Sequence, residues 1–369
     1  MKKTLVALAA LAVVGAASAQ SSVTLYGVVD AGVARVTGTK FAMTGSGLMN
    51  NGTSRFGFKG SEDLGGGMKA NFNMEAGFDP ETGAGNLSGG NLFSRAANVS
   101  LSGCFGEFRM GRSLTPSFYG VAAWELTGTA NYSVVASQFN FAGAGPRQSS
   151  QFMYVSPSMG GFSGSVAYTA RPDTGTPAAA AVYTLVNGLQ TLKTAAVASV
   201  PNGAKVDANL IYSAGPLAVG FSANRTDVNA VAATAAKLAT PTAFAVNAAP
   251  GTPAYTSTNY ALGAKYNFGM FQVAGSVQDS GKSPMDPAGN SKGFTLGAGA
   301  NLGPVALVVD IARDTYFEDT NVLFEAKYPL SKRTFAYAAY LNDGARAATA
   351  TTAAVTRTRG ASIGLRHNF

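Results

Sequence analysis

The chain ends Ala361-Ser362-Ile363-Gly364-Leu365-Arg366-His367-Asn368-Phe369, and this stretch decides the fold. Taken in steps of two, one face is largely apolar up to the final phenylalanine, and the other face is polar. A period of two is typical of a β-strand with one apolar and one polar face. Because the ends of soluble domains usually fray, an apolar face that reaches the C-terminus indicates a strand that is paired and covered there. We expect its partner to be the first strand of the mature chain, at residues 22–34.

The N-terminus predicts export. Lys2 and Lys3 precede an apolar run at residues 5–17, which ends in Ala17-Ser18-Ala19. A basic start, a short apolar core and small residues at the end are typical of a secretory signal peptide. Residues 1–19 are therefore interpreted as a signal peptide cleaved after Ala19, and residues 20–369 as the mature protein. The alternative, a membrane anchor, requires a longer span of ~20 apolar residues.

Composition excludes several classes of protein. Loss of Lys2 and Lys3 leaves 25 basic residues against 19 acidic ones, a net charge of about +6, with no Lys/Arg run that would form a nucleic-acid face. One cysteine, Cys104, excludes an internal disulfide. The single histidine, His367, excludes a multi-histidine metal site. We expect no metal, no cofactor and no nucleic-acid partner.

The alternation of the last strand recurs along the whole chain. We count about sixteen such segments, most near the ~9–11 residues that a tilted membrane strand requires. Short connections alternate with long ones at residues 114–146, 171–202, 226–256, 280–290 and 344–356, as expected of tight periplasmic turns and long outer loops. No later stretch approaches ~20 consecutive apolar residues. A membrane location therefore requires a closed barrel, since open sheet edges cannot face lipid.

The second face of these strands carries many charges, including Lys59, Lys69, Arg109 and Arg366. Burial of such groups in a dry core would cost several kcal/mol per ion, whereas a barrel of about sixteen strands leaves an aqueous channel. The sequence thus predicts an all-β fold, a 16-stranded antiparallel transmembrane β-barrel with a wet interior. A soluble β-sandwich, which also alternates, is the alternative fold.

Several motifs span the mature chain in a fixed order. They are SSVTLYG at 21–27, SRFGFKGSEDLG at 54–65, FGEFRMGR at 105–112, YVSP at 154–157, LSKRT at 330–334 and GLRHNF at 364–369. With these motifs the chain resembles the general porins of Gram-negative β-proteobacteria, the neisserial and Burkholderia-like family. The resemblance implies a homotrimer in the outer membrane, surrounded by outer-membrane lipid and lipopolysaccharide.

The resemblance also implies a pore constriction, formed where the third outer loop, residues 114–146, folds into the barrel. The positions that match the basic side of the constriction are Arg55, Arg95 and Arg147. Glu75 on the third strand and Glu125 in the loop match the acidic side. Lys59, Lys69 and Arg109 are expected to line the lumen elsewhere. A basic ring opposed by few acids favours anions; a structural ion pair between Arg55 and Glu75 is an alternative reading that is compatible with it.

The leading functional hypothesis is a porin: a water-filled channel for passive diffusion of small hydrophilic solutes and ions, leaning toward anions and without enzymatic activity. One alternative is an adhesin or receptor that acts through the long loops at residues 171–202 and 226–256. Another is an outer-membrane hydrolase. It would need a well-placed base, and the only imidazole, His367, lies at the end of the barrel where no active site is expected.

Overall fold

The computed structural model describes residues 22–86, 90–170, 182–186, 189–194, 202–228, 255–283, 286–344 and 357–369. The interpreted signal peptide, residues 1–19, and much of the expected loops at 171–202, 226–256 and 344–356 lie outside these ranges. None of the helices in the described ranges is long and apolar enough to cross a membrane.

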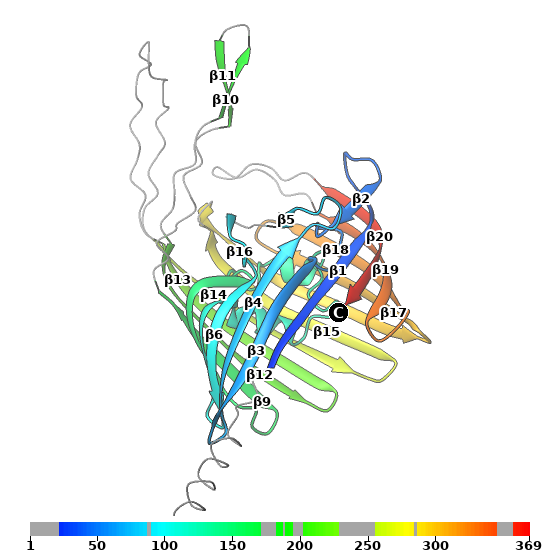
Figure 1. The fold of residues 1–369 in the computed structure, drawn as a ribbon. Helices are drawn as coiled ribbons and strands as arrows, with labels where there is room; N and C mark the ends of the chain where they lie inside the picture. Colours follow the sequence, from blue (N-terminus) through cyan, green and yellow to red (C-terminus); the bar gives the residue numbers. More distant parts are fainter. Residues whose placement is uncertain are drawn as a thin grey trace, which may run out of the picture.

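Sixteen long strands form a closed antiparallel barrel (Figure 1). They are β1 (Ser22–Val36), β3 (Arg55–Gly65), β4 (Met68–Phe78), β6 (Ala96–Gly103), β7 (Gly106–Leu114), β8 (Arg147–Val155), β9 (Phe162–Thr169), β12 (Asn202–Ala214), β13 (Leu217–Val228), β14 (Tyr255–Asn267), β15 (Phe271–Ser283), β16 (Asp286–Leu302), β17 (Val305–Asp314), β18 (Asp319–Pro329), β19 (Thr334–Asp343) and β20 (Thr358–Asn368). Two short strands, β2 (Ala42–Gly45) and β5 (Gly85–Asn86), extend the same sheet. A separate hairpin consists of β10 (Val182–Val186) and β11 (Leu189–Thr194).

The last strand closes the barrel, as the sequence predicts. β20 pairs with β19 on one side and with β1 on the other, where Val33 lies opposite Ile363. Beyond the ladder, Gly27 and Phe369 exchange both backbone hydrogen bonds, each at 3.0 Å. On its other side β1 pairs with β3 along Ser22–Val28 and with β2 along Ala31–Ala34. The seam between the first and the last strand is thus closed by hydrogen bonds, as a membrane barrel requires.

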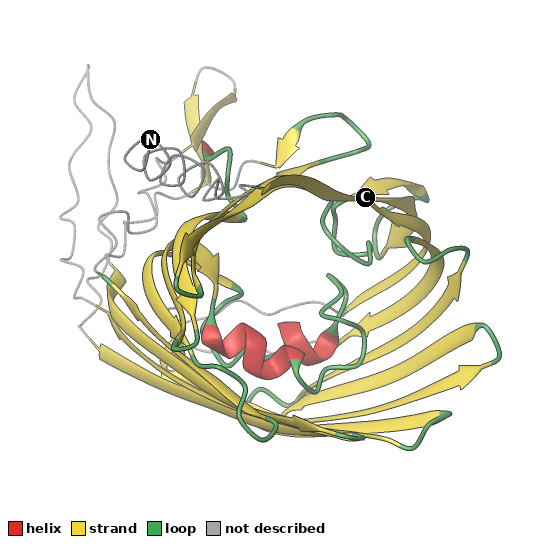
Figure 2. Cartoon of the chain, turned by 60° about the horizontal axis from the view of Figure 1, so that its bottom comes forward, coloured by secondary structure: helices red, strands yellow, loops and turns green. Residues whose placement is uncertain are grey.

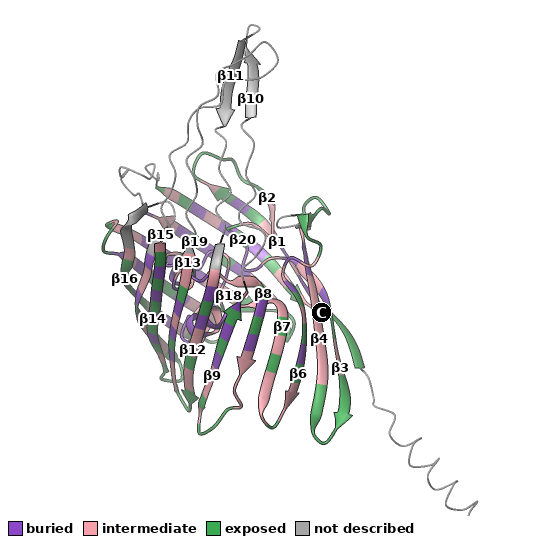
Figure 3. Cartoon of the chain, turned by 90° about the vertical axis from the view of Figure 1, so that its left-hand side faces the viewer, coloured by how far each residue is buried: buried purple, intermediate pink, exposed green. Residues whose placement is uncertain are grey.

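The two faces of the wall follow the alternation of the sequence. Outward side chains are apolar and exposed, as at Leu25 (56% exposed) and Ile363 (71% exposed). Inward side chains alternate with them and are polar or small, so buried and exposed residues form alternating bands along strands such as β9 and β14 (Figure 3). An exposed apolar belt around a polar interior is the arrangement expected of a membrane barrel.

The expected short turns lie at one end of the barrel. β6 and β7 are separated by Cys104 and Phe105 alone, and β16 and β17 by Gly303 and Pro304. The expected long loop at residues 280–290 was wrong, because β15 and β16 continue to Ser283 and from Asp286 and pair with each other there. Their outer ends extend past the apolar belt, where the alternation of apolar and polar residues disappears although strand pairing continues.

Residues 115–146, which we name the inner loop, lie inside the barrel. The loop contains α2 (Pro116–Ala122) and α3 (Val134–Ser137), and Figure 2 shows both helices within the ring of strands. Thr115 caps α2 by accepting a hydrogen bond from Phe118 N at 3.1 Å, and Pro116 occupies the first turn, where its missing N–H costs nothing. The resemblance predicts such an infolded loop, and the structure confirms it.

Candidate functional site

Three arginines meet on one wall of the lumen. Arg55 begins β3, Arg95 directly precedes β6, and Arg147 begins β8. All three of these strands run from the outer side toward the short turns, so their first residues lie at a similar height. The Nε of Arg147 donates to the backbone carbonyl of Arg95 at 3.1 Å, which fixes the two side by side. The structure therefore brings together the three arginines singled out in the sequence.

Glu75 on β4 is the counterion of this cluster. Its carboxylate contacts Arg95 Nε at 2.6 Å and Arg55 Nε at 3.6 Å, and it accepts a hydrogen bond from the Tyr26 hydroxyl at 3.0 Å. The ion pair between Arg55 and Glu75 thus exists, and both residues also line the lumen cavity described next. One carboxylate shared by two guanidinium groups leaves the cluster positively charged.

A cavity of about 490 Å³ lies between the arginine wall and the inner loop. Its charged lining residues are Arg55, Arg95, Arg147, Arg366 and Glu75, four positive charges against one negative charge, or +3. Arg366 was not among the predicted constriction residues. The sequence places Arg366 on the polar face of the last strand, which indicates a lumen residue. Its position near Arg55 follows only from the closure of β20 onto β1, which brings that face close to β3. There its Nη1 donates to Asn51 Oδ1 at 2.7 Å.

Glu125 is placed differently from the expectation. It is 3% exposed and accepts hydrogen bonds from three groups of its own loop, the Thr127 hydroxyl, Thr129 N at 2.7 Å and the Ser133 hydroxyl at 2.7 Å. It lines neither of the two lumen cavities, this one and the neighbouring one described next. The sequence places an acid in the loop, but the backbone turn around residues 125–133 directs it inward to the loop itself.

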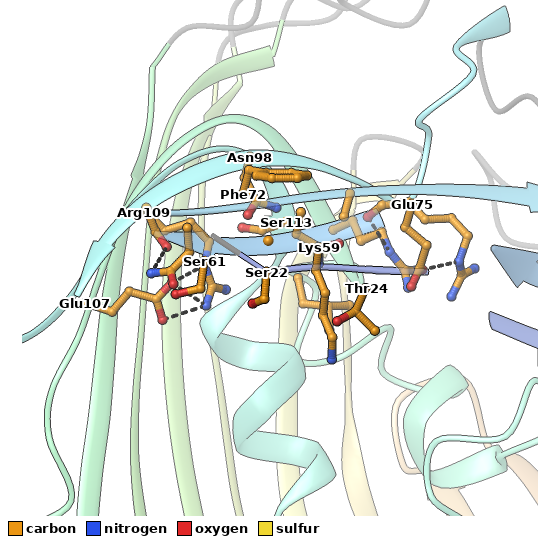
Figure 4. Close-up of a pocket in the computed structure, with 18 of the residues that line it drawn as sticks. Ser22, Thr24, Lys59, Ser61, Phe72, Glu75, Asn98, Glu107, Arg109 and Ser113 are labelled. Carbon is orange, nitrogen blue, oxygen red and sulfur yellow. Dashed lines mark hydrogen bonds and ion pairs between the residues drawn. The ribbon is translucent and has the colours of Figure 1, made fainter. Parts of the chain in front are cut away.

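A second cavity of about 410 Å³ adjoins the first and shares Glu75, Arg95 and Arg147 with it. Lys59 and Arg109 line it, as expected for lumen residues (Figure 4). Arg109 is paired with Glu107 at 2.9 Å, whereas the ammonium of Lys59 lies 5.3 Å from the centre of the Tyr26 ring. Lys69 is exposed near the start of β4 and lines neither cavity.

The inner loop is fastened near both of its ends to β12 and β13, which follow β9 in the barrel. Asp207 on β12 accepts a hydrogen bond from the Ser117 hydroxyl at 2.6 Å, at the start of α2. Lys205 on the same strand donates to the Ala144 carbonyl at 2.6 Å, close to the end of the loop. Asn224 on β13 adds a bond to the Ala142 carbonyl at 2.8 Å. These bonds hold the loop away from the arginines.

The middle of the loop is fastened through Tyr132. Its hydroxyl donates to Glu325 Oε2 on β18 at 2.6 Å, and Asn51 Nδ2 donates to the same hydroxyl at 3.0 Å. Burial and the neighbouring Glu325 carboxylate raise the pKa of Tyr132, so the hydroxyl remains a donor at neutral pH. Lys327 pairs with Glu325 at 2.9 Å and also donates to the Thr127 carbonyl at 2.7 Å.

In the described ranges, no group of three or more acidic, histidine or cysteine side chains is placed to hold a metal ion.

A closed barrel with a polar lumen, an apolar outer belt and a charged constriction defines a transmembrane channel of the outer membrane. The chain belongs to the Gram-negative porin family, whose model matches residues 4–348. This membership establishes it as an outer-membrane porin, which is a channel protein.

Individual relatives agree with the family. The chain is 34% identical to the outer membrane porin protein 32 of Delftia acidovorans, over 84% of this chain and 78% of that protein. It is 30% identical to an outer membrane porin protein of Bordetella pertussis, over 74% and 68% of the two chains. Among solved structures, an anion-selective porin from Comamonas acidovorans superposes with a TM-score of 0.67 at 27% identity, covering 95% of this chain and 100% of that one.

Proposed function

We propose that this porin prefers anions, and that Arg55, Arg95, Arg147 and Arg366 impose the preference at the narrowest part of the lumen. The observation that carries the proposal is the charge of the cavity between wall and inner loop, four arginines against Glu75. Rings of positive side chains favour anions in pores. The similar Comamonas acidovorans structure is described as an anion-selective porin, which supports the same preference here.

The diffusion path follows the same geometry. Small hydrophilic solutes and ions pass between the inner loop and the arginine wall, driven by their own gradients. The loop limits their size, while the arginines lower the energy of anions and raise that of cations. Because Glu125 bonds to its own loop, only Glu75 among the expected acids opposes the arginines.

Reversal potentials in a planar bilayer under a KCl gradient test the preference. The wild-type channel should show a potential of the sign set by chloride. Replacement of Arg55, Arg95 and Arg147 together by serine should move it toward that of potassium. At ~4 Å in water one charge contributes about 1 kcal/mol, or about fivefold in ion partition, so the permeability ratio should change at least that much.

Arg225→Ser is a control for the position of the charge. Arg225 lies on the outward face of β13 with a 64% exposed side chain, so its loss removes one arginine charge away from the constriction. The potential of this variant should equal that of the wild type. A wild-type channel with clear cation preference, or a triple variant without any shift, would refute the proposal.

We infer that the working assembly is a homotrimer embedded in outer-membrane lipid and lipopolysaccharide, with residues 1–19 removed as a signal peptide. The resemblance to general porins supports the trimer, and the exposed apolar belt supports the lipid surroundings. Insertion of single particles into a bilayer should give conductance in three equal steps. Particles that always give one step would contradict the trimer without affecting the proposed selectivity.

A further inference from the structure

The wall behind the inner loop has glycine at three lumen-facing positions. Gly220 on β13 lies directly opposite Gly263 on β14, and Gly297 lies two strands farther along on β16. All three lie on the lumen-facing side of their strands, where Ser222, Ala261 and Thr295 are buried neighbours of the same face. We name Gly220, Gly263 and Gly297 the glycine floor.

The backbone conformation does not explain these glycines. Many glycines of this chain adopt a positive φ, including Gly65 and Gly303 in the short turns, and there other residues would be strained. The three residues of the glycine floor are not among them. A glycine within a regular strand weakens it and often marks a site of close approach. Glycine is therefore required at these three positions by the groups that pack against them.

Trp124 lies on the floor. This side chain follows α2 in the inner loop and is 1% exposed. A Cβ on Gly263 would lie 2.2 Å from Trp124 Cε2 and 2.5 Å from its Nε1, and a Cβ on Gly220 would lie 3.1 Å from Trp124 Cδ1. Distances below 3.0 Å are essentially never seen for real Cβ atoms, so the indole occupies the space that a side chain on β14 would need.

Two further contacts extend the same fit. A Cβ on Gly220 would lie 2.3 Å from the carbonyl oxygen of Gly120 in α2. A Cβ on Gly297 would lie 2.2 Å from Asp310 Oδ1 on the neighbouring β17 and 2.9 Å from Leu126 Cδ1 of the inner loop. Trp124 Nε1 is buried and has no hydrogen-bond partner among the residues that the structure describes. The position of the Trp124 indole is therefore determined by the shape of the wall and not by a polar contact.

We propose that the glycine floor sets the aperture of the pore, because it lets Trp124 and α2 lie directly on the backbone of the barrel wall. This role is separate from the anion preference, which concerns the opposite wall. The sheet behind the floor is hydrogen-bonded on both sides and cannot retreat. A side chain at Gly263 would push the indole and the inner loop away from this wall, toward the cavity in front of the arginines, and would narrow that cavity.

Gly263→Ala and Gly263→Val, each in the full chain, test this inference in a planar bilayer. Single-channel conductance should fall with side-chain size, by about half or more for valine, and the preference for chloride should rise because ions pass closer to the arginines. Gly275→Ala on neighbouring β15 is the matched control. Its added Cβ meets only ordinary contacts at 3.5 Å, so its conductance should be that of the wild type.

A double variant separates positioning from a general loss of structure. In a Trp124→Ala background the space above Gly263 is vacant, so Gly263→Val should no longer lower the conductance. If the valine variant fails to fold, as judged by its heat-dependent mobility in detergent gels, the alanine variant and Gly220→Ala, whose Cβ would also meet α2 and Trp124, carry the same expectation. Wild-type conductance in folded Gly263→Ala and Gly263→Val, or an equal loss with and without Trp124, would overturn the proposal.

Discussion

At the scale of single residues, Glu75 controls the charge of the constriction. It is the one carboxylate among five charged side chains that line the cavity, and it contacts Arg55, Arg95 and Tyr26 at once. Such a residue has two effects with opposite consequences. It holds the arginine side chains in place, and it cancels part of the positive field that they produce.

Glu75→Gln separates these effects. The amide keeps the size of the side chain but removes the charge, so the formal charge of the cavity rises from +3 to +4. We expect the chloride-to-potassium permeability ratio to increase by up to about fivefold, the effect of about 1 kcal/mol per charge at close range in water. Reversal potentials in a KCl gradient measure it.

The control for this substitution is Glu107→Gln. Glu107 lines the second cavity, where it pairs with Arg109. The same loss of charge farther from the narrow passage should change the ratio less. A Glu75→Gln channel whose preference falls would show that holding the arginines matters more than the charge of the carboxylate.

The parity of the strands predicted that Arg55 and Glu75 lie on the polar face, and that face is the lumen. Arg95 and Arg147 lie beside loops, and the resemblance to the porin family singled them out. The orientation of the Glu125 side chain could not be predicted from strand parity, because a loop has no regular alternation of inward and outward residues. Its carboxylate is oriented by the turn that brings Thr129 N and the Ser133 hydroxyl within 2.7 Å.

At the scale of elements, the inner loop behaves as a part of the wall. Its start, middle and end are bonded to β12, β18 and β13, respectively, by side chains that are buried in the barrel. Buried hydrogen bonds are costly to leave half made. The loop should therefore hold a fixed position, and the pore should have one main open conductance.

Asp207→Ala tests this rigidity. The substitution leaves the buried Ser117 hydroxyl without its 2.6 Å acceptor, a cost of about 1–3 kcal/mol. We expect more noise in the open-channel current at constant voltage, and a lower midpoint of thermal unfolding. Asp227→Ala, on the outer face of the neighbouring strand with a 50% exposed side chain, should leave both quantities unchanged. Equal noise in the two variants would contradict the role of the anchor.

The elements themselves were predictable to different degrees. Strands that cross the apolar belt show their period in the sequence, as from Val305 to Ile311. The outer ends of β15 and β16 do not, because outside the belt neither face needs apolar side chains, and the sequence suggested a loop at residues 280–290. α2 is a seven-residue helix held by tertiary contacts. Such short helices are marginal by themselves, so the sequence carries little signal for them.

At the scale of the whole molecule, closure depends on the fit of Phe369 over Gly27. A Cβ on Gly27 would lie 2.3 Å from Phe369 Cζ, so the ring of the last residue covers the first strand. We expect Gly27→Ala to lower the temperature at which the folded barrel loses its fast mobility in detergent gels. Phe369→Leu should lower it too. The double variant should lose less than the sum of the two, since the smaller side chain makes room for the methyl group. Strict additivity would show that the two residues do not share this contact.

The selectivity is also a property of the whole channel, since it depends on the salt that fills the lumen. The Debye length is about 10 Å at 0.1 M salt and about 3 Å at 1 M. The cavity of about 490 Å³ has a width comparable with the first value and larger than the second. At 0.1 M the +3 charge of the lining therefore acts on an ion anywhere in the passage, whereas at 1 M it acts only on ions next to an arginine.

We expect the preference for chloride, measured by reversal potentials at a fixed tenfold gradient, to decrease when the mean concentration rises from about 0.1 M to about 1 M. The variant without Arg55, Arg95 and Arg147 should show a much smaller change. A preference that is independent of salt in the wild type would mean that ions are selected by direct contact with individual side chains, and that the field of the cluster contributes little.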